Sequence, residues 1–299
     1  MGFFVLPVFA QDPALPPTNL GMANMMDGVA GPPGLVFANY TQIYRTRRIM
    51  DGNGQALPTD LKINSIASIN QLIYLTRIRF AGGNLAFTVI IPITQLTAEG
   101  SGPKPTVNPG VLGDPAIGIA VQWSDKKLFK HKFFHRFETT PTLPLGSYRS
   151  GYDINTSSHL YGLSAYHAFT FYFNNQFSLS GRNQINFNSH TLGTPEHAGT
   201  FYNGNYSLEH NITKSLRAEL IGYYLTQIGE DSYQGDHGYF TGLQAVITSQ
   251  ERIMGYGPGL AILLNRGIMI EGKVLFENLA RNRTEGMKSV LRIAIPLNL

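Results

Sequence analysis

An alternation of polar and apolar residues recurs along this chain and constrains its fold more than any other feature. In residues 176–188 the even-numbered positions are polar and most odd-numbered ones are apolar. The pattern returns in 267–279 and 288–299, where charged residues fall on one parity only. Because successive side chains of a strand point to opposite faces, these segments are predicted to be β-strands with one polar and one apolar face.

Turn signals divide the chain from residue 35 onward into about twelve such segments, which predicts an all-β fold, an antiparallel transmembrane β-barrel of about 12 strands. The predicted strands are about 35–48, 61–79, 84–94, 114–124, 133–143, 159–173, 175–188, 200–211, 215–228, 251–264, 267–279 and 287–299. Their connections alternate between long and short, and the long set ends with ARNRTEG at 280–286. A soluble β-sandwich would also alternate apolar and polar residues, but it gives no reason for long loops at one end only. We therefore expect short periplasmic turns, longer extracellular loops and both termini in the periplasm.

The composition agrees with a barrel surrounded by lipid. Charged residues make up 14% of the chain, against about 25% in typical soluble domains. The longest nearly apolar stretch, 85–93, is about half as long as a membrane-spanning helix requires. The basic stretch 126–136 alternates with aromatic residues; we interpret it as a membrane-edge turn followed by a strand and expect no nucleic-acid partner.

The N-terminal residues predict processing and a separate short segment. Residues 1–10 read as the remnant of a signal peptide, with Val8 and Ala10 at the small-residue positions before the cleavage site. A basic region before the apolar core is missing, which suggests a start further upstream; an ordinary apolar first strand is the alternative. Residues 11–33, rich in Pro, Gly and Met, are expected to form a periplasmic tether or a plug, and 34–299 the transmembrane barrel.

Charged residues on the polar parity should line the lumen, because a charge that faces lipid at mid-depth costs about 2–4 kcal/mol. The lumen-lining candidates are Arg45, Arg136, Glu138, Arg182, Arg217, Glu219, Glu271, Lys273, Glu277 and Arg292. Several are opposite charges two residues apart, namely Arg136 with Glu138, Arg217 with Glu219 and Glu271 with Lys273. Such pairs serve either to hold the shape of the lumen or to select solutes.

Two further patterns concern the barrel wall. Aromatic residues on the outward faces should form belts at the two water interfaces, with Tyr40, Tyr44, Trp123, Phe133, Phe171, Phe173, Tyr202, Tyr206 and Tyr224 as candidates. In 255–261, Gly255, Gly257, Gly259 and Ala261 share one face. This wall of small residues either permits strand curvature or makes room for a plug or a solute.

Enzymatic alternatives have little support in the sequence. A loop active site would use Asp236 and His237, which lie near Glu230 and Asp231 within one predicted loop. An outer-membrane protease of that kind needs its pairs from opposite walls, and a solvated polar loop explains the cluster equally well. No His precedes a Ser at the spacing of an outer-membrane phospholipase, and no HExxH or phosphate-loop motif occurs. We therefore expect no enzyme, no cofactor and no metal.

Five segments resemble the family of outer-membrane β-barrel transporters named for the meta-pathway of phenol degradation. They are PPGLVFANYTQIY at 32–44, GDPAIGIAVQW at 113–123, PLGSY at 144–148, GYYLTQ at 222–227 and GPGLAI at 257–262. The resemblance implies a location in the bacterial outer membrane and a transporter for aromatic or other hydrophobic compounds; it carries over no binding residue.

Together with a barrel narrower than the general porins, this predicts a monomeric or trimeric channel for small hydrophobic or aromatic solutes that works by passive diffusion. A structural or adhesive barrel with a lumen closed by 11–33 is the third possibility. The expected partners are outer-membrane lipid, lipopolysaccharide, the solute, and the barrel-assembly machinery for insertion.

Overall fold

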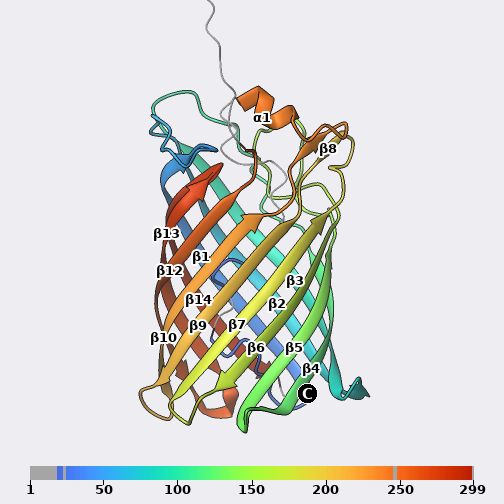
Figure 1. The fold of residues 1–299 in the computed structure, drawn as a ribbon, viewed down its shortest axis with the longest axis vertical. Helices are drawn as coiled ribbons and strands as arrows, with labels where there is room; N and C mark the ends of the chain where they lie inside the picture. The colour runs from blue at the N-terminus through green and yellow to red at the C-terminus, as the bar shows by residue number, and fades with distance from the viewer. Residues whose placement is uncertain (1–18, 23–24, 245–247, 298–299) are drawn as a thin grey trace, which may run out of the picture.

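Twelve strands close into one antiparallel barrel (Figure 1). The computed structural model describes residues 19–22, 25–244 and 248–297, without the side chains of 125 and 242–244. The barrel strands are β1 (Gly34–Met50), β2 (Lys62–Phe80), β3 (Gly83–Glu99), β4 (Ala116–Leu128), β5 (His131–Thr142), β6 (Gly162–Tyr172), β7 (Phe177–Asn188), β9 (Phe201–Asn211), β10 (Leu216–Gln227), β12 (Arg252–Leu263), β13 (Met269–Arg281) and β14 (Arg283–Leu297). The predicted fold class and strand number are confirmed.

Each strand pairs with its neighbour in the chain, and β1 closes the ring against β14. The closing register runs from Leu35 opposite Leu297 to Met50 opposite Arg283. Sequential antiparallel pairing closes the ring, so backbone groups of neighbouring strands bond to each other rather than to water, as a bilayer demands. Within the described ranges, no helix is long and apolar enough to cross a membrane.

The connections differ at the two ends of the barrel, as the sequence predicted. At one end lie the long loops 51–61, 100–115, 143–161, 189–200 and 228–251, and at the other the short turns 81–82, 129–130, 173–176, 212–215 and 264–268. The expected long connection 280–286 is wrong, because β13 and β14 continue through it and leave only Asn282 between them.

Short strands and helices lie in the connections between the barrel strands. The two-residue strands β8 (Glu196–His197) and β11 (Ser232–Tyr233) pair with each other above the barrel, and α1 (Tyr239–Gln244) follows β11. The 3-10 turn η1 (Asn265–Gly267) lies in the short turn between β12 and β13. The long-loop end is thus partly covered, as Figure 1 shows.

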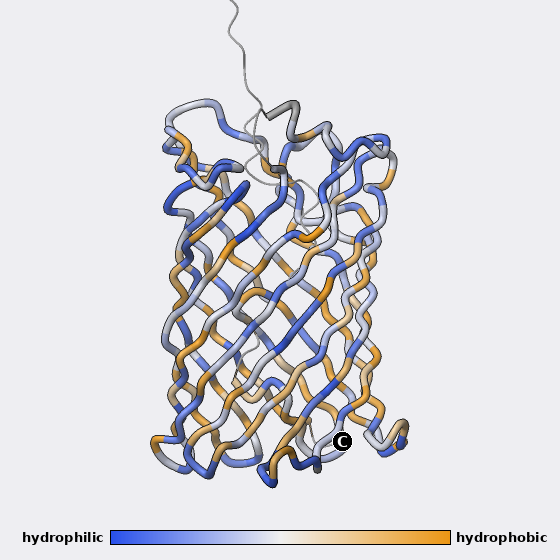
Figure 2. The backbone as a smooth tube through the Cα atoms, viewed as in Figure 1, coloured by the Kyte–Doolittle hydropathy of each residue, from blue (hydrophilic) through white to orange (hydrophobic). Residues whose placement is uncertain are grey.

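The wall separates an apolar exterior from a polar interior, and Figure 2 shows the alternation along each strand. Outward side chains at mid-strand, such as Ile91, Ile119 and Phe137, are between 44% and 49% exposed. Inward side chains, such as Ser180, Asn203 and Asn205, are fully buried. This is the reverse of a soluble protein, and it places the hydrocarbon of a bilayer against the outer face.

Candidate functional site

Most of the predicted lumen charges point inward and are buried. The buried ones are Arg136, Glu138, Arg182, Arg217, Glu219, Glu271, Lys273 and Glu277. Arg292 belongs to the same inward parity of β14 and keeps a side chain that is 14% exposed. Buried charges that were not among the candidates include Asp27, Glu209, Glu251, Glu285 and Lys288.

Arg45 is the exception, and its placement in the lumen is wrong. The inward positions of this part of β1 are Tyr44 and Thr46, whereas Arg45 is exposed and shares the outward parity of Ile43. Arg45 lies near the long-loop end of β1, where an outward charge can reach water and costs only about 0–1 kcal/mol.

Of the three opposite-charge pairs two residues apart, two form ion pairs within their own strand. Lys273 binds Glu271 at 2.5 Å, and Arg136 Nε lies 3.4 Å from Glu138. Arg217 instead binds Glu209 on the neighbouring strand, at 3.2 Å. Glu209 has the same inward parity as Asn205 and Ser207, so the alternation could have identified it as well.

An internal segment, defined here as residues 19–22 and 25–33, lies inside the barrel against this charged wall. Three cations donate to its backbone carbonyls: Lys288 to Leu20 (3.0 Å), Lys273 to Met22 (2.9 Å) and Arg292 to Met25 (3.2 Å). These bonds use the main chain, so the sequence of the segment gave no signal for them.

Small residues let the segment lie close to the wall. A side chain at Gly255 or Gly259 would overlap the ring of Tyr223 or the carboxylate of Glu219, so both side chains fold flat against β12. Gly21, which has a φ of +72°, lies about 3.0 Å from Leu275 and Tyr223 at its Cβ position. The small-residue stretch of β12 therefore makes room for side chains that the internal segment then covers.

After Met25, near the short-turn end of the barrel, the segment leaves β12–β14 and contacts other strands. The backbone N–H of Met26 donates to Glu209 of β9, at 2.9 Å. Asp27 accepts two hydrogen bonds from the guanidinium of Arg182 on β7. This pair is buried on both sides, with 9% and 4% of the side chains exposed.

The segment then reaches the opposite wall. Gly28 donates to Thr170 of β6 and accepts from Gln122 of β4. Ala30 packs against Leu75, Ala86 and Ala120 of β2, β3 and β4. Residues 25–30 thus contact first β12–β14, then β9, β7 and β6, and finally β2–β4, so they traverse the lumen.

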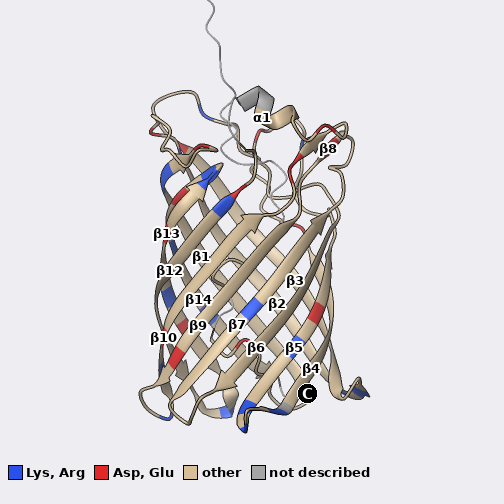
Figure 3. Cartoon of the chain, in the orientation of Figure 1, with Lys and Arg blue, Asp and Glu red and all other residues tan. Residues whose placement is uncertain are grey.

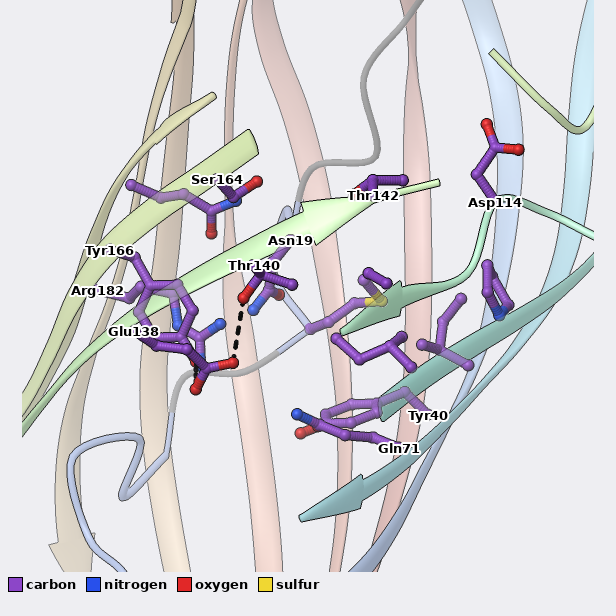
Figure 4. A pocket seen from close by; sticks show the side chains of 16 residues that line it. Asn19, Tyr40, Gln71, Asp114, Glu138, Thr140, Thr142, Ser164, Tyr166 and Arg182 are labelled. Atoms are coloured by element: carbon purple, nitrogen blue, oxygen red, sulfur yellow. Dashed lines mark hydrogen bonds between the residues drawn. The ribbon is translucent and has the colours of Figure 1, made fainter. Parts of the chain in front are cut away.

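On the long-loop side of this traverse, the lumen holds two hollows. One has an apolar part with Tyr40, Ile69, Ile90 and Pro92, and a polar end with Glu138. In Figure 4, Tyr40 and Gln71 lie on one side of this cavity and Glu138, Tyr166 and Arg182 on the other. The second hollow shares Met22, Ile69, Pro92 and Asp114 with the first, so the two adjoin.

The polar end of the first hollow is rigidly hydrogen-bonded. Glu138 accepts from the hydroxyls of Tyr166, at 2.5 Å, and Thr140, at 3.2 Å. The guanidinium of Arg182 stacks over the Tyr166 ring, 4.1 Å from its centroid. Their hydrogen-bonding groups are mostly used by one another, which leaves the apolar side as the freer surface of the hollow.

Inward side chains of β2 and β3 form a mostly apolar strip, defined as Ala67, Ile69, Ile73, Leu75, Ala86, Ile90 and Pro92, with the polar residues Gln71 and Thr88 between them. Register pairs join Ile69 to Pro92 and Leu75 to Ala86. The strip begins at the hollows and ends where Ala30 covers Leu75 and Ala86. The lumen therefore has this strip on β2 and β3 and a second apolar cluster, with Phe201, Ile221, Leu225, Ile253 and Leu275, on the strands across from it.

Two of the nine candidates for the aromatic belts, Tyr40 and Tyr44, were placed wrongly on the outer face. Tyr40 is 6% exposed and lies under the guanidinium of Arg292, while the Tyr44 hydroxyl donates to Glu277 at 2.8 Å. Both share the inward parity of Ala38 and line the lumen. On the outer face, Trp123 donates from its indole N–H to Ala81 at the β2–β3 turn, 3.0 Å away.

The four predicted loop residues do not converge. Asp236 and His237 are exposed, and Asp236 caps the N–H of Gly238. Glu230 accepts from Thr248 and Ser249, whereas Asp231 is buried and accepts from Gly199 and Gln227. Burial raises the pKa of Asp231 to about 6, against the lowering effect of the Gly199 N–H. Among the described side chains, no three His, Cys, Asp or Glu residues gather as metal ligands.

A closed antiparallel barrel with an apolar outer face and a polar lumen defines a β-barrel of the bacterial outer membrane. The model of the family described as "Putative MetA-pathway of phenol degradation" matches residues 46–293, and the chain belongs to this family. The resemblance seen in the sequence is thereby confirmed. No functionally curated protein sequence matches the chain.

Solved structures match the chain at low sequence identity. The COG4313 outer membrane channel from Pseudomonas putida F1 is 11% identical, with a TM-score of 0.77 over 92% of this chain and 100% of that one. The β domain of the Bordetella autotransporter BrkA is 8% identical, with a TM-score of 0.50 over 89% and 100%. The NanC porin is 7% identical, with a TM-score of 0.42 over 87% and 100%.

Proposed function

We propose that the protein is a channel through which small hydrophobic or aromatic solutes diffuse passively across the outer membrane. The observation that carries the proposal is the mostly apolar strip on β2 and β3, which lines part of the lumen and leads away from the hollow beside Tyr40. An apolar wall in a water-filled lumen favours solutes with apolar surface, because contact releases water from both. The family description, which names phenol degradation, supports the same solute class.

In this conformation the internal segment blocks the path at Ala30, so transport requires the segment to shift. Its attachment is partly apolar, through Leu20, Met25 and Ala30, and partly polar: backbone groups and Asp27 meet charged side chains that water could solvate instead. Exchanging such bonds for bonds to water costs little net free energy per bond, about 0.5–1.5 kcal/mol. The segment is therefore suited to act as a removable plug, and no cofactor is needed.

Liposome flux measurements test the channel directly. Purified protein in liposomes should admit phenol faster than a polar sugar of similar size. Substituting Ile69→Gln together with Ile90→Gln should slow phenol entry, whereas Thr94→Gln, which adds bulk on the same inner wall without removing apolar surface, should not. A protein that forms no pore, and whose deletion leaves aromatic uptake by cells unchanged, would end the proposal.

The traverse by residues 25–30 favours one second candidate, a structural or adhesive barrel whose lumen stays closed. Removing residues 19–33 distinguishes the two. A channel with a removable plug should conduct at least intermittently with the segment present, and continuously without it. A structural barrel should conduct only after the removal.

A further inference from the structure

A groove at the short-turn mouth of the barrel lies between the β4–β5 and β6–β7 turns. Lys130, His131 and Lys132 form one side of it, and Asn174 lies on the other. Phe134 and Tyr172 form its floor, with ring centroids 5.8 Å apart in an edge-to-face contact. Figure 3 shows Lys and Arg gathered on the turns at this end of the barrel.

The lysines near the tip of the β4–β5 hairpin are not neutralised by the described carboxylates. Lys127 and Lys132 lie directly opposite each other in the register of β4 and β5, an arrangement that like charges make unfavourable. Neither these two nor Lys130 takes part in any ion pair among the described side chains. Asp125 is the one acid among residues 124–133, and its side chain lies outside the described part. An anion in the groove would relieve the repulsion.

The floor of the groove faces the lumen rather than the bilayer. Phe134 has the inward parity of Arg136, and Tyr172 has that of Thr170. The carbonyl of Phe134 lies 2.6 Å from the Cβ position of Gly28, so this floor adjoins the internal segment on its short-turn side. A solute that passes the traverse would meet the groove next.

We propose that this groove binds the carboxylate of a small aromatic acid as it leaves the lumen, with the ring on Phe134 and Tyr172 and the carboxylate at Lys130 and Lys132. This inference rests on the proposed channel function and narrows its solute class to aromatic anions. The amide of Asn174, whose oxygen already accepts from Gln176 and Phe177, leaves its N–H donors for the same anion. Carboxylates are ionised at neutral pH, so the charged sides and the aromatic floor match the two halves of such a ligand.

Equilibrium binding of benzoate to the purified protein in a neutral detergent tests the groove without requiring transport. The wild type should bind benzoate and not its uncharged analogue benzyl alcohol. Lys130→Gln with Lys132→Gln should weaken benzoate binding about tenfold, because two close charge-assisted contacts are lost. The control, Lys104→Gln with Arg149→Gln, removes the same charge from exposed positions in the long loops and should leave binding unchanged.

The outcomes separate the groove from the channel. Equal benzoate binding by the Lys130/Lys132 variant and the wild type overturns the groove, whatever the conductance. Equal affinity for benzoate and benzyl alcohol overturns it too. A third outcome is that benzoate binding depends on the two lysines but the protein conducts no ions in planar bilayers of zwitterionic lipid. This would support the groove proposal and contradict the channel function.

Discussion

The carboxylate of Asp27 accepts two hydrogen bonds from the guanidinium of Arg182, at 2.6 and 2.7 Å, across 155 residues of sequence. It is the one side-chain ion pair between the described part of the internal segment and the barrel wall. The other attachments of the segment use backbone atoms, or the apolar contacts of Leu20, Met22, Met25, Met26 and Ala30. This pair is therefore the place where one substitution acts on the segment most directly.

Replacing Asp27 by Asn should loosen the internal segment and raise the open probability of the channel. The substitution leaves the buried Arg182 without its counter-charge, and breaking a buried pair from one side costs about 3–5 kcal/mol, less where lumen water reaches the arginine. Single-channel recording in planar bilayers measures the effect, with Asp153→Asn in an exposed loop as the control. An unchanged open probability, with unchanged protease sensitivity of residues 19–33, would show that the pair does not hold the segment.

Gly28→Ala should displace the segment, whereas Gly31→Ala should not. A Cβ at Gly28 would lie 2.4 Å from backbone atoms of Phe169 and Thr170, which the wall cannot move. A Cβ at Gly31 meets nothing within 4 Å. The comparison is read from conductance and from the melting temperature of each variant. Two variants with the same conductance would contradict the packing of Gly28 against β6.

The loss of stability caused by a charged side chain on the outer face should depend on its depth in the membrane. Ile91 lies at the centre of β3 and is 44% exposed, whereas Ile78 lies near the short-turn end of β2 and is 61% exposed. Ile91→Lys should destabilise the folded barrel by about 2–4 kcal/mol and Ile78→Lys by about 0–1 kcal/mol. Denaturant unfolding from lipid vesicles measures both. Equal losses would mean that the two positions do not differ in membrane depth.

The extracellular loops should weaken as the pH rises through about 6. Burial raises the pKa of Asp231 above its ordinary value of 3.8 to about 6. The stabilisation from the protonated form is complete below about 4 and is lost as the pH rises past 6. Hydrogen exchange at the Gly199 amide, which donates to Asp231, should therefore show less protection at pH 7 than at pH 4.5, after correction for the intrinsic rate.

Asp231→Asn should remove this dependence, because the amide keeps an acceptor oxygen for Gly199 and does not ionise. If the variant retains the full pH dependence of protection, another group controls this loop.

The alternation of polar and apolar residues predicts which face of a strand each side chain lies on, and no more than that. It assigned Arg136, Glu138, Arg182 and Glu271 to the interior because side-chain direction follows from residue number once a strand is recognised. It misplaced Arg45 because parity contains no information about depth, and a charge near the rim can face outward. It misplaced Tyr40 and Tyr44 because tyrosine suits both a membrane interface and a hydrogen-bonded lumen.

The contacts of the internal segment could not be predicted from the sequence, for a different reason. Residues 19–33 have no period that reveals a face, and most of their bonds to the wall use backbone groups common to every residue. The partner cations Lys273 and Arg292 were recognised as inward, but nothing in the sequence indicates that their acceptors are carbonyls of Met22 and Met25. The last hairpin was misjudged because the polar, charged run 280–286 resembles a loop, while two of its charges are paired: Glu285 with Arg47 and Arg48, and Arg283 with Glu251.

The pairing of β1 with β14 has a consequence for how the molecule is made. Val36 lies opposite Pro296, so the ring cannot close until almost the whole chain has been synthesised and delivered. The internal segment immediately precedes β1 and already occupies the enclosed space. Assembly must therefore either close the wall around the segment or thread it afterwards through a mouth. A pulse-labelled chain that acquires protease protection of residues 19–33 before or after the β1–β14 seam forms would reveal the order of these two steps.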